Sequence, residues 1–547
     1  MHVDIAYKKQ NGKTYKRILL RESYRDDGKV KHRTIANISH CSNDEIHAIK
    51  LALKNKGDLT KLGSFRDNVH SKQGLSVGAI VLLKTLADRL HITKALGDSL
   101  NGKLALWQVM ARIIDRGSRL SAVRLAQSHA VCYLLNLKGF SEDELYYNLD
   151  WLCDNQEAIE NKLVSLRYKG SHLPRLFLYD VTSSYLEGME NELSDWGYNR
   201  DGKKGKLQIV IGLLTDAEGV PVSVEVFKGN TNDTKTFLNQ IHKIANRFKI
   251  KEVTIVGDRG MIKSAQIEGL KEANFNYITA ITKPQIENLV KNRIFQLELF
   301  SEKLCEIVSD NIRYILRRNP QRAEEIEETR KAKIEKVQII TKEQSSYLAE
   351  HKNAQVSIAQ RKVQKSIDKL KLSAFVNVKS EDRILSIEVD KKKKEESKQL
   401  DGCYVIRTEL TDEISMQTIH QRYKDLSLVE QGFRTMKTGF LETRPIFVRK
   451  EKRTRGHVFV VMLAYLMIHE LQKLWAEMDV TVEEGITELS TISSMKITIE
   501  GTSYHQIPHP RDKGEKLLEL AHVILPPILP CTNVNVATNR KLPERRK

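Results

Sequence analysis

The chain has 547 residues, with 89 lysines and arginines against 70 aspartates and glutamates, and a net charge of +19. This charge favours a polyphosphate partner such as DNA, and the length predicts roughly two to four domains. The longest apolar run, Val458 to Ile468, is too short to span a bilayer, the N-terminus lacks a secretory signal, and the six cysteines form no CxxC pair. We therefore expect a cytoplasmic protein, associated with the bacterial nucleoid when it acts, with no membrane contact.

Residues 1–60 are expected to form a small β meander followed by a helix. Apolar and polar residues alternate around Asn11-Gly12 and Asp27-Gly28. Both dipeptides are strong signals for a tight hairpin turn between antiparallel strands.

Residues 75–168 are expected to form a helical DNA-binding region. Apolar residues recur at helical spacing on both sides of an Asn101-Gly102 break, and a turn at residues 115–118 separates two helices. This succession, with Arg116, Arg119 and Arg124, could insert into a DNA groove. A helical bundle with a solvated arginine edge is an equally simple interpretation.

Residues 174–282 contain two apolar strands that each close on an aspartate, Asp180 and Asp258. Between them lie two strands joined by a tight turn and a helix that Asp233 can cap, and a helix and a strand follow Asp258. This order resembles the plan of the ribonuclease H fold, an α/β fold with a mixed five-stranded sheet and flanking helices. In that plan the two aspartate strands are parallel neighbours.

Residues 283–410 interrupt this plan and are expected to form an insertion domain. The segment is strongly charged, with helical stretches and a lysine run at 391–394, and its end returns as a strand over 402–408. Alternating charge on helices usually marks a solvated face.

Residues 411–475 are expected to complete the core with an acid-bearing helix and an apolar packing helix over 456–475. Tyr423, Glu430 and Lys437 are seven residues apart, which places them on one stripe of a single helix. The neighbouring apolar stripe consists of Leu426, Val429, Phe433 and Met436. The C-terminal region, 476–547, ends in a basic segment, Arg540 to Lys547, that is expected to be disordered.

The ordered acids and the spaced helix residues resemble the DDE-type insertion-sequence transposases of the insertion-sequence-four superfamily. Their signature is Tyr, two residues, Arg, three residues, Glu, six residues, Lys. Tyr423, Glu430 and Lys437 keep this spacing, but Leu426 occupies the arginine position, which is typical of a divergent branch. Four further phrases are similar to segments around the acids in this family: 197–203, 229–233, 257–261 and Arg444-Pro445-Ile446.

The resemblance implies a metal-dependent polynucleotidyl transferase with Asp180, Asp258 and Glu430 as catalytic and metal-binding residues. Two Mg²⁺ or Mn²⁺ ions are implied, with Asp180 bridging them and the other two acids each completing one site. Lys437 would hold a phosphate and Tyr423 would contact nucleotides at the DNA end. Arg434 could supply the charge that Leu426 lacks.

The implied partners are double-stranded DNA, as terminal inverted repeats and target, and a second copy of the chain in a synaptic complex. Two alternatives remain at this point: a ribonuclease H-fold nuclease or resolvase that only cuts, and a non-catalytic DNA-binding protein derived from a transposase. Trp196 and His457 lie near the motifs, and we expect both to be packed or hydrogen-bonded side chains without a role in the chemistry.

Overall fold

A computed structural model describes residues 1–10, 13–57, 69–168, 174–203, 205–248, 250, 253–437, 439–443, 446–499 and 502–529. The predicted turn at Asn11-Gly12, the pair Arg444-Pro445 and the tail Arg540 to Lys547 lie outside these residues. The chain divides into two compact units. One comprises 1–81, 127–138 and 488–535, and the other 82–126, 139–487 and 536–547.

The first unit begins with a three-stranded antiparallel sheet, in the order β1 (His2–Gln10), β2 (Lys13–Asp26), β3 (Lys29–Asn37). Asp27 and Gly28 both have positive φ angles in the turn between β2 and β3, as the Asp-Gly signal predicts. Helix α1 (Asn43–Lys54) follows and begins with a capping box at Ser42 and Glu45. The expected meander and helix are therefore present.

A second sheet of this unit joins distant parts of the chain. Its order is β16 (Thr502–Gln506), β15 (Ser493–Ile499), β4 (Val69–Ser76), and both pairings are antiparallel. The helices α7 (Val131–Leu134) and α19 (Asp512–Leu520) belong to the same unit.

The second unit is built on an eight-stranded mixed sheet in the order β10-β11-β14-β9-β8-β5-β6-β7. Its strands are β5 (Leu176–Tyr185), β6 (Gln208–Asp216), β7 (Pro221–Lys228), β8 (Thr254–Gly257), β9 (Asn276–Ala280), β10 (Cys305–Ser309), β11 (Ile312–Arg318) and β14 (Cys403–Thr408). The five strands β7-β6-β5-β8-β9 have the predicted order, and β5 and β8 are parallel neighbours. The sheet has eight strands instead of the expected five. The three additional strands extend it from the free edge of β9, where β14 pairs with β9, β11 with β14, and β10 with β11.

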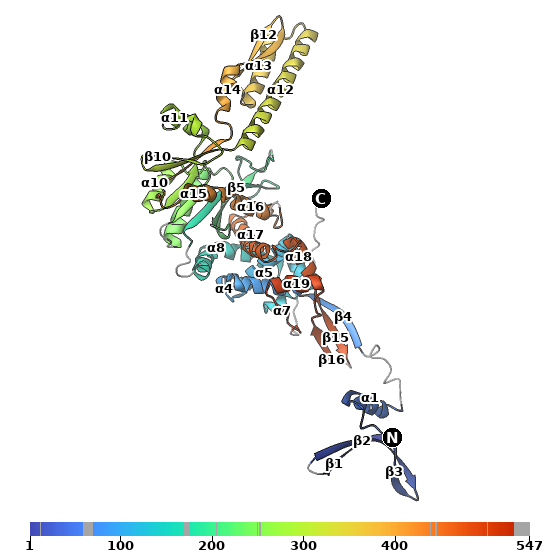
Figure 1. The fold of residues 1–547 in the computed structure, drawn as a ribbon. Coiled ribbons are helices and arrows are strands. Elements are labelled where there is room, and N and C mark those ends of the chain that lie inside the picture. The colour runs from blue at the N-terminus through green and yellow to red at the C-terminus, as the bar shows by residue number, and fades with distance from the viewer. Residues whose placement is uncertain are drawn as a thin grey trace. The chain divides into compact units, whose positions relative to one another are not determined.

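The second unit also contains helices, some of which pack on the sheet (Figure 1). They are α4 (Ile92–Leu96), α5 (Leu100–Ile114), α8 (Glu142–Arg167), α9 (Asp233–His242), α10 (Ser264–Glu272), α11 (Lys283–Lys291) and α17 (Glu451–Leu474), with most of α3 (Gly78–Arg89), α6 (Arg119–Ser128) and α18 (Val482–Ser490), each of which has one end in the first unit. Helix α17 is long and apolar enough to cross a membrane by length and composition, but 72% of its apolar 18-residue stretch is buried inside the protein. It is the packing helix that the sequence predicts, and it lies against α8, α5 and β7.

The predicted insertion is smaller than expected and has its own core. Its elements are α12 (Pro320–Glu350), α13 (Val356–Lys369), β12 (Val376–Glu381), β13 (Ile384–Val389) and α14 (Lys391–Lys398) (Figure 1, yellow to orange). Val337, Val363, Ile367 and Val376 are fully buried in a separate hydrophobic cluster of this segment. The flanking strands β10, β11 and β14 belong to the main sheet instead.

The acid-bearing helix is two helices, which corrects the prediction of one. Helix α15 (Met416–Lys424) carries Tyr423, and α16 (Leu426–Lys437) carries Glu430 and Lys437. The break falls at Asp425, whose amide donates to the Gln421 carbonyl and whose carbonyl accepts from the Leu428 amide three residues on. The Asp425 carboxylate also accepts hydrogen bonds from Gln421 and Arg422, which stabilises the local turn.

Candidate active site

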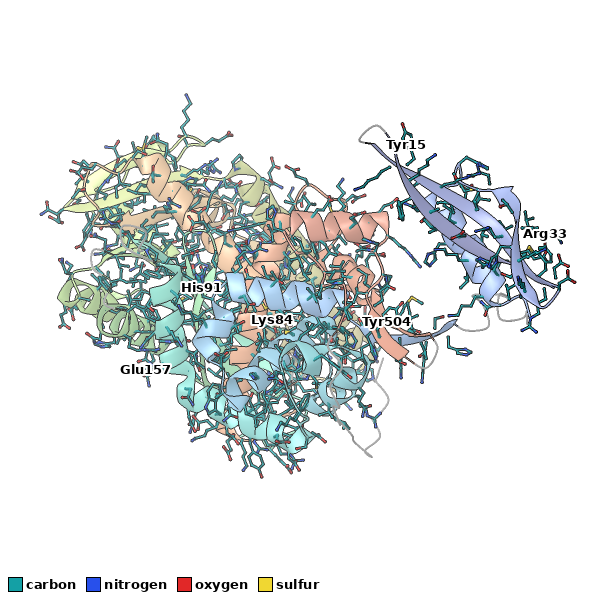
Figure 2. The ribbon with its side chains drawn as sticks, turned by 90° about the horizontal axis from the view of Figure 1, so that it is seen from below. Tyr15, Arg33, Lys84, His91, Glu157 and Tyr504 are labelled. Atoms are coloured by element: carbon teal, nitrogen blue, oxygen red, sulfur yellow. The ribbon has the colours of Figure 1, made fainter. Side chains whose placement is uncertain are left out.

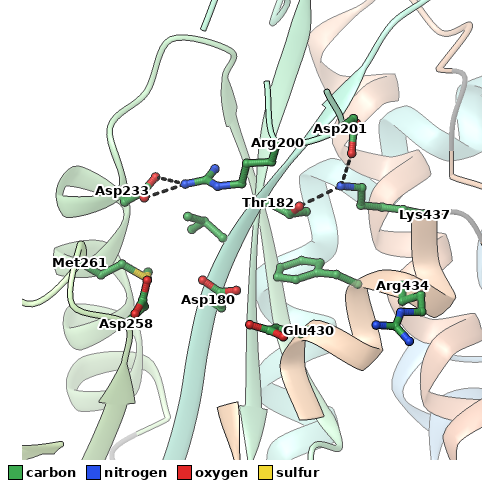
Figure 3. A pocket seen from close by; sticks show the side chains of 12 residues that line it. Asp180, Thr182, Arg200, Asp201, Asp233, Asp258, Met261, Glu430, Arg434 and Lys437 are labelled. Carbon is green, nitrogen blue, oxygen red and sulfur yellow. Dashed lines mark hydrogen bonds and ion pairs between the residues drawn. The ribbon is translucent and has the colours of Figure 1, made fainter. Parts of the chain in front are cut away.

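Three carboxylates from distant parts of the sequence line one cavity of about 530 Å³ in the second unit (Figure 3). Asp180 lies on β5, Asp258 directly follows β8, and Glu430 lies on α16. In Figure 3 the three side chains face a common space between the sheet and α16. The structure thus brings together all three predicted catalytic acids.

The register of the sheet places the two aspartates. Tyr179 is paired with Gly257 across the parallel strands β5 and β8, so the next residue on each side is an aspartate. Both strands are mostly apolar and mostly buried up to that point, as in a sheet covered on both faces, and the aspartates follow directly. This is why two separate strand patterns produce one acidic site.

The apolar face of α16 places Glu430. Val429, Phe433 and Met436 are 0%, 5% and 1% exposed, so they hold this helix against the core as the sequence predicts. Glu430 follows Val429 on the exposed side and lines the cavity.

Negative charge is concentrated around Asp180. Burial, together with the nearby carboxylates of Asp258 and Glu430, raises the pKa of its carboxyl to about 7. A hydrogen bond from the Val181 backbone and the charge of Arg200 act in the opposite direction. The carboxyl of Asp180 is therefore easily protonated in the DNA-free protein, and a nearby cation would stabilise its ionised form.

Two other aspartates line the same cavity, but each has a cationic partner. Arg200 donates from one guanidinium nitrogen to both carboxylate oxygens of Asp233, at 2.7 and 2.6 Å. Lys437 Nζ lies 2.6 Å from Asp201 Oδ1 and donates to Thr182 Oγ1 at 2.9 Å. Asp201 and Asp233 therefore differ from the three acids of the predicted triad in having a cationic partner.

The remaining predicted residues of this site lie around it. Tyr423 donates a long hydrogen bond of 3.4 Å to Asp258 Oδ1, and burial together with that carboxylate raises the pKa of its hydroxyl. Arg434 is exposed and lines the cavity wall one helical turn beyond Glu430. Leu426, at the arginine position of the signature, is half-buried at the start of α16.

Of the three arginines predicted for DNA contact in the helical region, Arg119 is held inside the protein, and Arg116 and Arg124 are half-buried. Arg119 is only 6% exposed, donates to Gln108 Oε1, and bonds to His457 Nδ1 at 2.9 Å. Most of α6 is buried with it, so this helix does not present an open recognition face. Arg116 pairs with Glu442 and Glu483, and Arg124 is half-buried. The predicted helix, turn and helix are present, and Arg116 and Arg119 bond to other parts of the protein, so their contact with DNA stays a prediction.

His457 and Trp196, for which no role in the chemistry was expected, differ in their burial. His457 is buried and hydrogen-bonded, as expected. Trp196 is 56% exposed, which contradicts the expected packing, and it lines a second cavity of about 510 Å³ that shares Arg200 and Asp233 with the first. Sequence reasoning identified the segments carrying Arg200, Asp201 and Asp233 but not their roles, because ion pairs between loops leave no local pattern.

Among the described residues, no group of three or more His, Cys, Asp or Glu side chains is arranged closely enough to hold a metal ion as it stands. The three carboxylates surround open space instead. They supply oxygen donors only, which is the donor type that hard divalent cations prefer.

Comparisons with known proteins match two parts of the chain. Residues 3–61 match the family described as IS1634 family transposase, N-terminal domain, and residues 171–467, more than half of the chain, match the family described as Transposase DDE domain. No curated protein matches. Among solved structures, the piggyBac transposase synaptic complex with hairpin DNA is similar, with 9% identity, a TM-score of 0.35, and coverage of 82% of this chain and 80% of that one.

Proposed function

The chain belongs to the DDE-type insertion-sequence transposases, and from this premise we propose that Asp180, Asp258 and Glu430 are its catalytic carboxylates. The observation that carries the proposal is their convergence on one cavity, although 250 positions separate the first acid from the last. Asp201 and Asp233 share the cavity but are neutralised by Lys437 and Arg200. Among the described residues, the cavity carboxylates that form no ion pair are therefore those of the three acids.

The same three carboxylates would hold two Mg²⁺ or Mn²⁺ ions. All three present hard oxygen donors, and the pKa of Asp180 is raised mainly by burial and also by the neighbouring carboxylates, whose charge a divalent cation would offset. When bound, such ions stabilise the attacking and leaving oxygens of a phosphodiester substitution. Asp180 would contact both ions, and its position between the other two acids in Figure 3 supports this role.

The reaction is DNA cleavage followed by strand transfer. With water as the nucleophile the DNA end is nicked, and with the freed 3′-hydroxyl as the nucleophile that end is joined to target DNA. One site serves both steps because both are the same substitution at phosphorus. The substrates are double-stranded element ends and target DNA, bound by a dimer that pairs two ends.

Basic and aromatic side chains around the cavity would hold the DNA. Arg434 is exposed on its wall, where its guanidinium would contact a phosphate. Lys437 would bind a phosphate by exchanging its present partner, Asp201. Tyr423 would lie near the DNA end, and its hydroxyl also orients Asp258.

The test is strand transfer of a labelled element end, measured with wild type and with Asp180→Ala. The proposal expects metal-dependent nicking and joined product from wild type and neither from the variant. Nicking without joining would favour a nuclease or resolvase, and no metal-dependent nicking by wild type would favour a non-catalytic DNA-binding protein. Asp180→Ala protein that retains the wild-type melting temperature serves as the folding control.

A further inference from the structure

The N-terminal sheet and its helix carry a disproportionate share of the positive charge. Residues 1–57 contain nine lysines and four arginines against four aspartates and two glutamates, a net charge of +7 out of +19 for the whole chain. Charge of this density on about a tenth of the chain is typical of a surface that meets a polyanion.

One face of this sheet is closed by α1. Val3, Ile5 and Ile18 point to the same side, as the pairing of Ile5 with Ile18 and of Val3 with Leu20 requires. They form a small core with Ile46 and Ile49 of the helix. The other face carries no residue of this core, and most of its residues are exposed, although Leu19 on it is only 9% exposed.

The open face is defined by the alternate residues, and it is basic. Cross-strand pairs place on it His2 beside Arg21, Asp4 beside Leu19, Ala6 beside Arg17, Lys8 beside Tyr15, Ser23 beside His32 and Arg25 beside Val30. Its only acid on the described strands, Asp4, is paired with Arg21 at 2.9 Å.

Three cations of the open face have no counter-charge. Lys8, Arg17 and Arg25 are exposed and form no ion pair with any residue that the structure describes. Tyr15, 57% exposed, stands directly opposite Lys8 and adds an aromatic surface (Figure 2). On the α1 face, by contrast, Lys31 pairs with Asp26 and Arg33 with Glu22.

Other basic segments are less suited to this role. In the lysine run of α14, Lys393 pairs with Asp390 and Lys394 with Glu327. The predicted helical region holds Arg119 in the interior and Arg116 in two ion pairs.

We propose that the open face of the N-terminal sheet binds the phosphate backbone of duplex DNA through Lys8, Arg17 and Arg25, with Tyr15 packing against the same duplex. This inference rests on the proposed function, because a transposase requires a surface that retains DNA beyond the few nucleotides in the catalytic cavity. Strands with alternating basic residues are a known means of lying along a DNA groove.

The test compares two variants of the full chain that lose the same charge from opposite faces. The first is Lys8→Gln/Arg17→Gln/Arg25→Gln, and the matched control is Lys9→Gln/Lys16→Gln/Lys29→Gln, whose exposed lysines project from the α1 side of the strands. Binding of a fluorescent random-sequence duplex is followed by anisotropy over a salt series in EDTA. Unchanged melting temperatures confirm that both variants fold.

Each lost phosphate contact removes about 0.9 from the slope of log K against log salt, so the open-face variant is expected to lose roughly 2.7 and the control less than about 1. Equal losses in the two variants, or no loss in either, would overturn the proposal. Tighter binding of the single strand than of the duplex by wild type would overturn the assignment to duplex DNA.

This outcome is separable from that of the proposed function, because binding is measured without metal. Metal-dependent nicking by wild type together with unaltered binding of the open-face variant would reject this inference alone. Face-selective loss of binding in a chain whose wild type never nicks DNA would reject the proposed catalysis alone.

Discussion

Lys437 and Asp201 form a nearly buried ion pair, with Nζ 2.6 Å from Oδ1 and side-chain exposures of 11% and 4%. The pair joins α16, which carries Glu430, to the loop that follows β5, which carries Asp180. Thr182 Oγ1 accepts a second bond from the same ammonium at 2.9 Å. A residue expected to bind phosphate therefore also positions the third acid against the first strand of the site.

A double-mutant cycle on this pair measures that structural role. Lys437→Met and Asp201→Asn are each expected to destabilise the protein, and the double variant less than the sum, with a coupling of roughly 1–3 kcal/mol because the pair is shielded from solvent. Urea unfolding gives the four free energies. The exposed pair of Lys31 with Asp26, cycled in the same way, should show a coupling below about 1 kcal/mol.

Replacing a carboxylate of the triad should lower activity much more than replacing a neighbouring aspartate that already has a cationic partner. Asp258→Asn is expected to lower metal-dependent nicking on the order of 10³-fold or more, because it removes a carboxylate directed at the reacting centre. Asp233→Asn, in the same cavity, is expected to lower nicking less than about tenfold, since Asn can still accept a hydrogen bond from Arg200. Comparable losses in both variants would contradict the assignment of the triad.

Mg²⁺ should stabilise the folded chain through the same acids. A ligand that binds only the folded state raises its stability by about 2.7 kcal/mol at a hundredfold excess over Kd. The melting temperature of wild type is therefore expected to rise by a few degrees, roughly, between EDTA and saturating Mg²⁺. Glu430→Gln should lose most of this rise, and Glu335→Gln, on an exposed position of α12, should keep it.

The sequence predicted the parts of the site that depend on strand and helix periodicity. Asp180 and Asp258 follow apolar strands whose order determined their adjacency, and the apolar stripe of α16 determined the direction of Glu430. Long-range pairing was not predictable. The three extra strands depend on which sheet edge remains free, and the break at Asp425 depends on one local turn.

The position of the arginines predicted for DNA contact also depends on long-range contacts that local sequence patterns do not show. Arg119 has the sequence context of an exposed helix, but it meets Gln108 of the preceding helix and His457, which lies 338 positions further along the chain. No local pattern reveals such partners. The alternation of the N-terminal strands, by contrast, is visible in the sequence, and only the position of α1 was needed to identify the open face.

The close packing of α17 on α8 should make one glycine irreplaceable. A Cβ at Gly456 would lie 2.2 Å from the Leu149 carbonyl oxygen, a backbone atom that cannot move without separating the helices. Gly456→Ala is expected to destabilise the protein by about 1–3 kcal/mol in urea unfolding, although Ala alone favours a helix. Gly269→Ala in α10, whose nearest neighbour is the flexible end of Leu238 at 3.0 Å, should be neutral or stabilising.

His457 should make the stability of the protein depend on pH below neutrality. Arg119 donates to Nδ1, so the ring proton lies on Nε2, which faces the Thr443 carbonyl at 3.3 Å. Burial lowers the pKa of His457 well below its usual value, and the charges of Arg112 and Arg119 lower it further. The native ring therefore stays neutral.

The unfolded chain, in contrast, protonates this histidine near pH 6.5, so it binds more protons than the folded chain below that pH. The contribution of His457 to the free energy of unfolding should accordingly fall as the pH drops from about 7.5 to about 5.5, by up to about 1.4 kcal/mol per pH unit at the acid end, whereas Asp180, whose pKa is raised to about 7, contributes in the opposite direction. The stability of wild type relative to His457→Gln should therefore fall with the pH over this range, whichever of the two proteins is more stable at pH 7.5. His242→Gln, at an exposed position of α9, should retain the wild-type slope, and a shallower slope in that variant instead would place the pH dependence elsewhere.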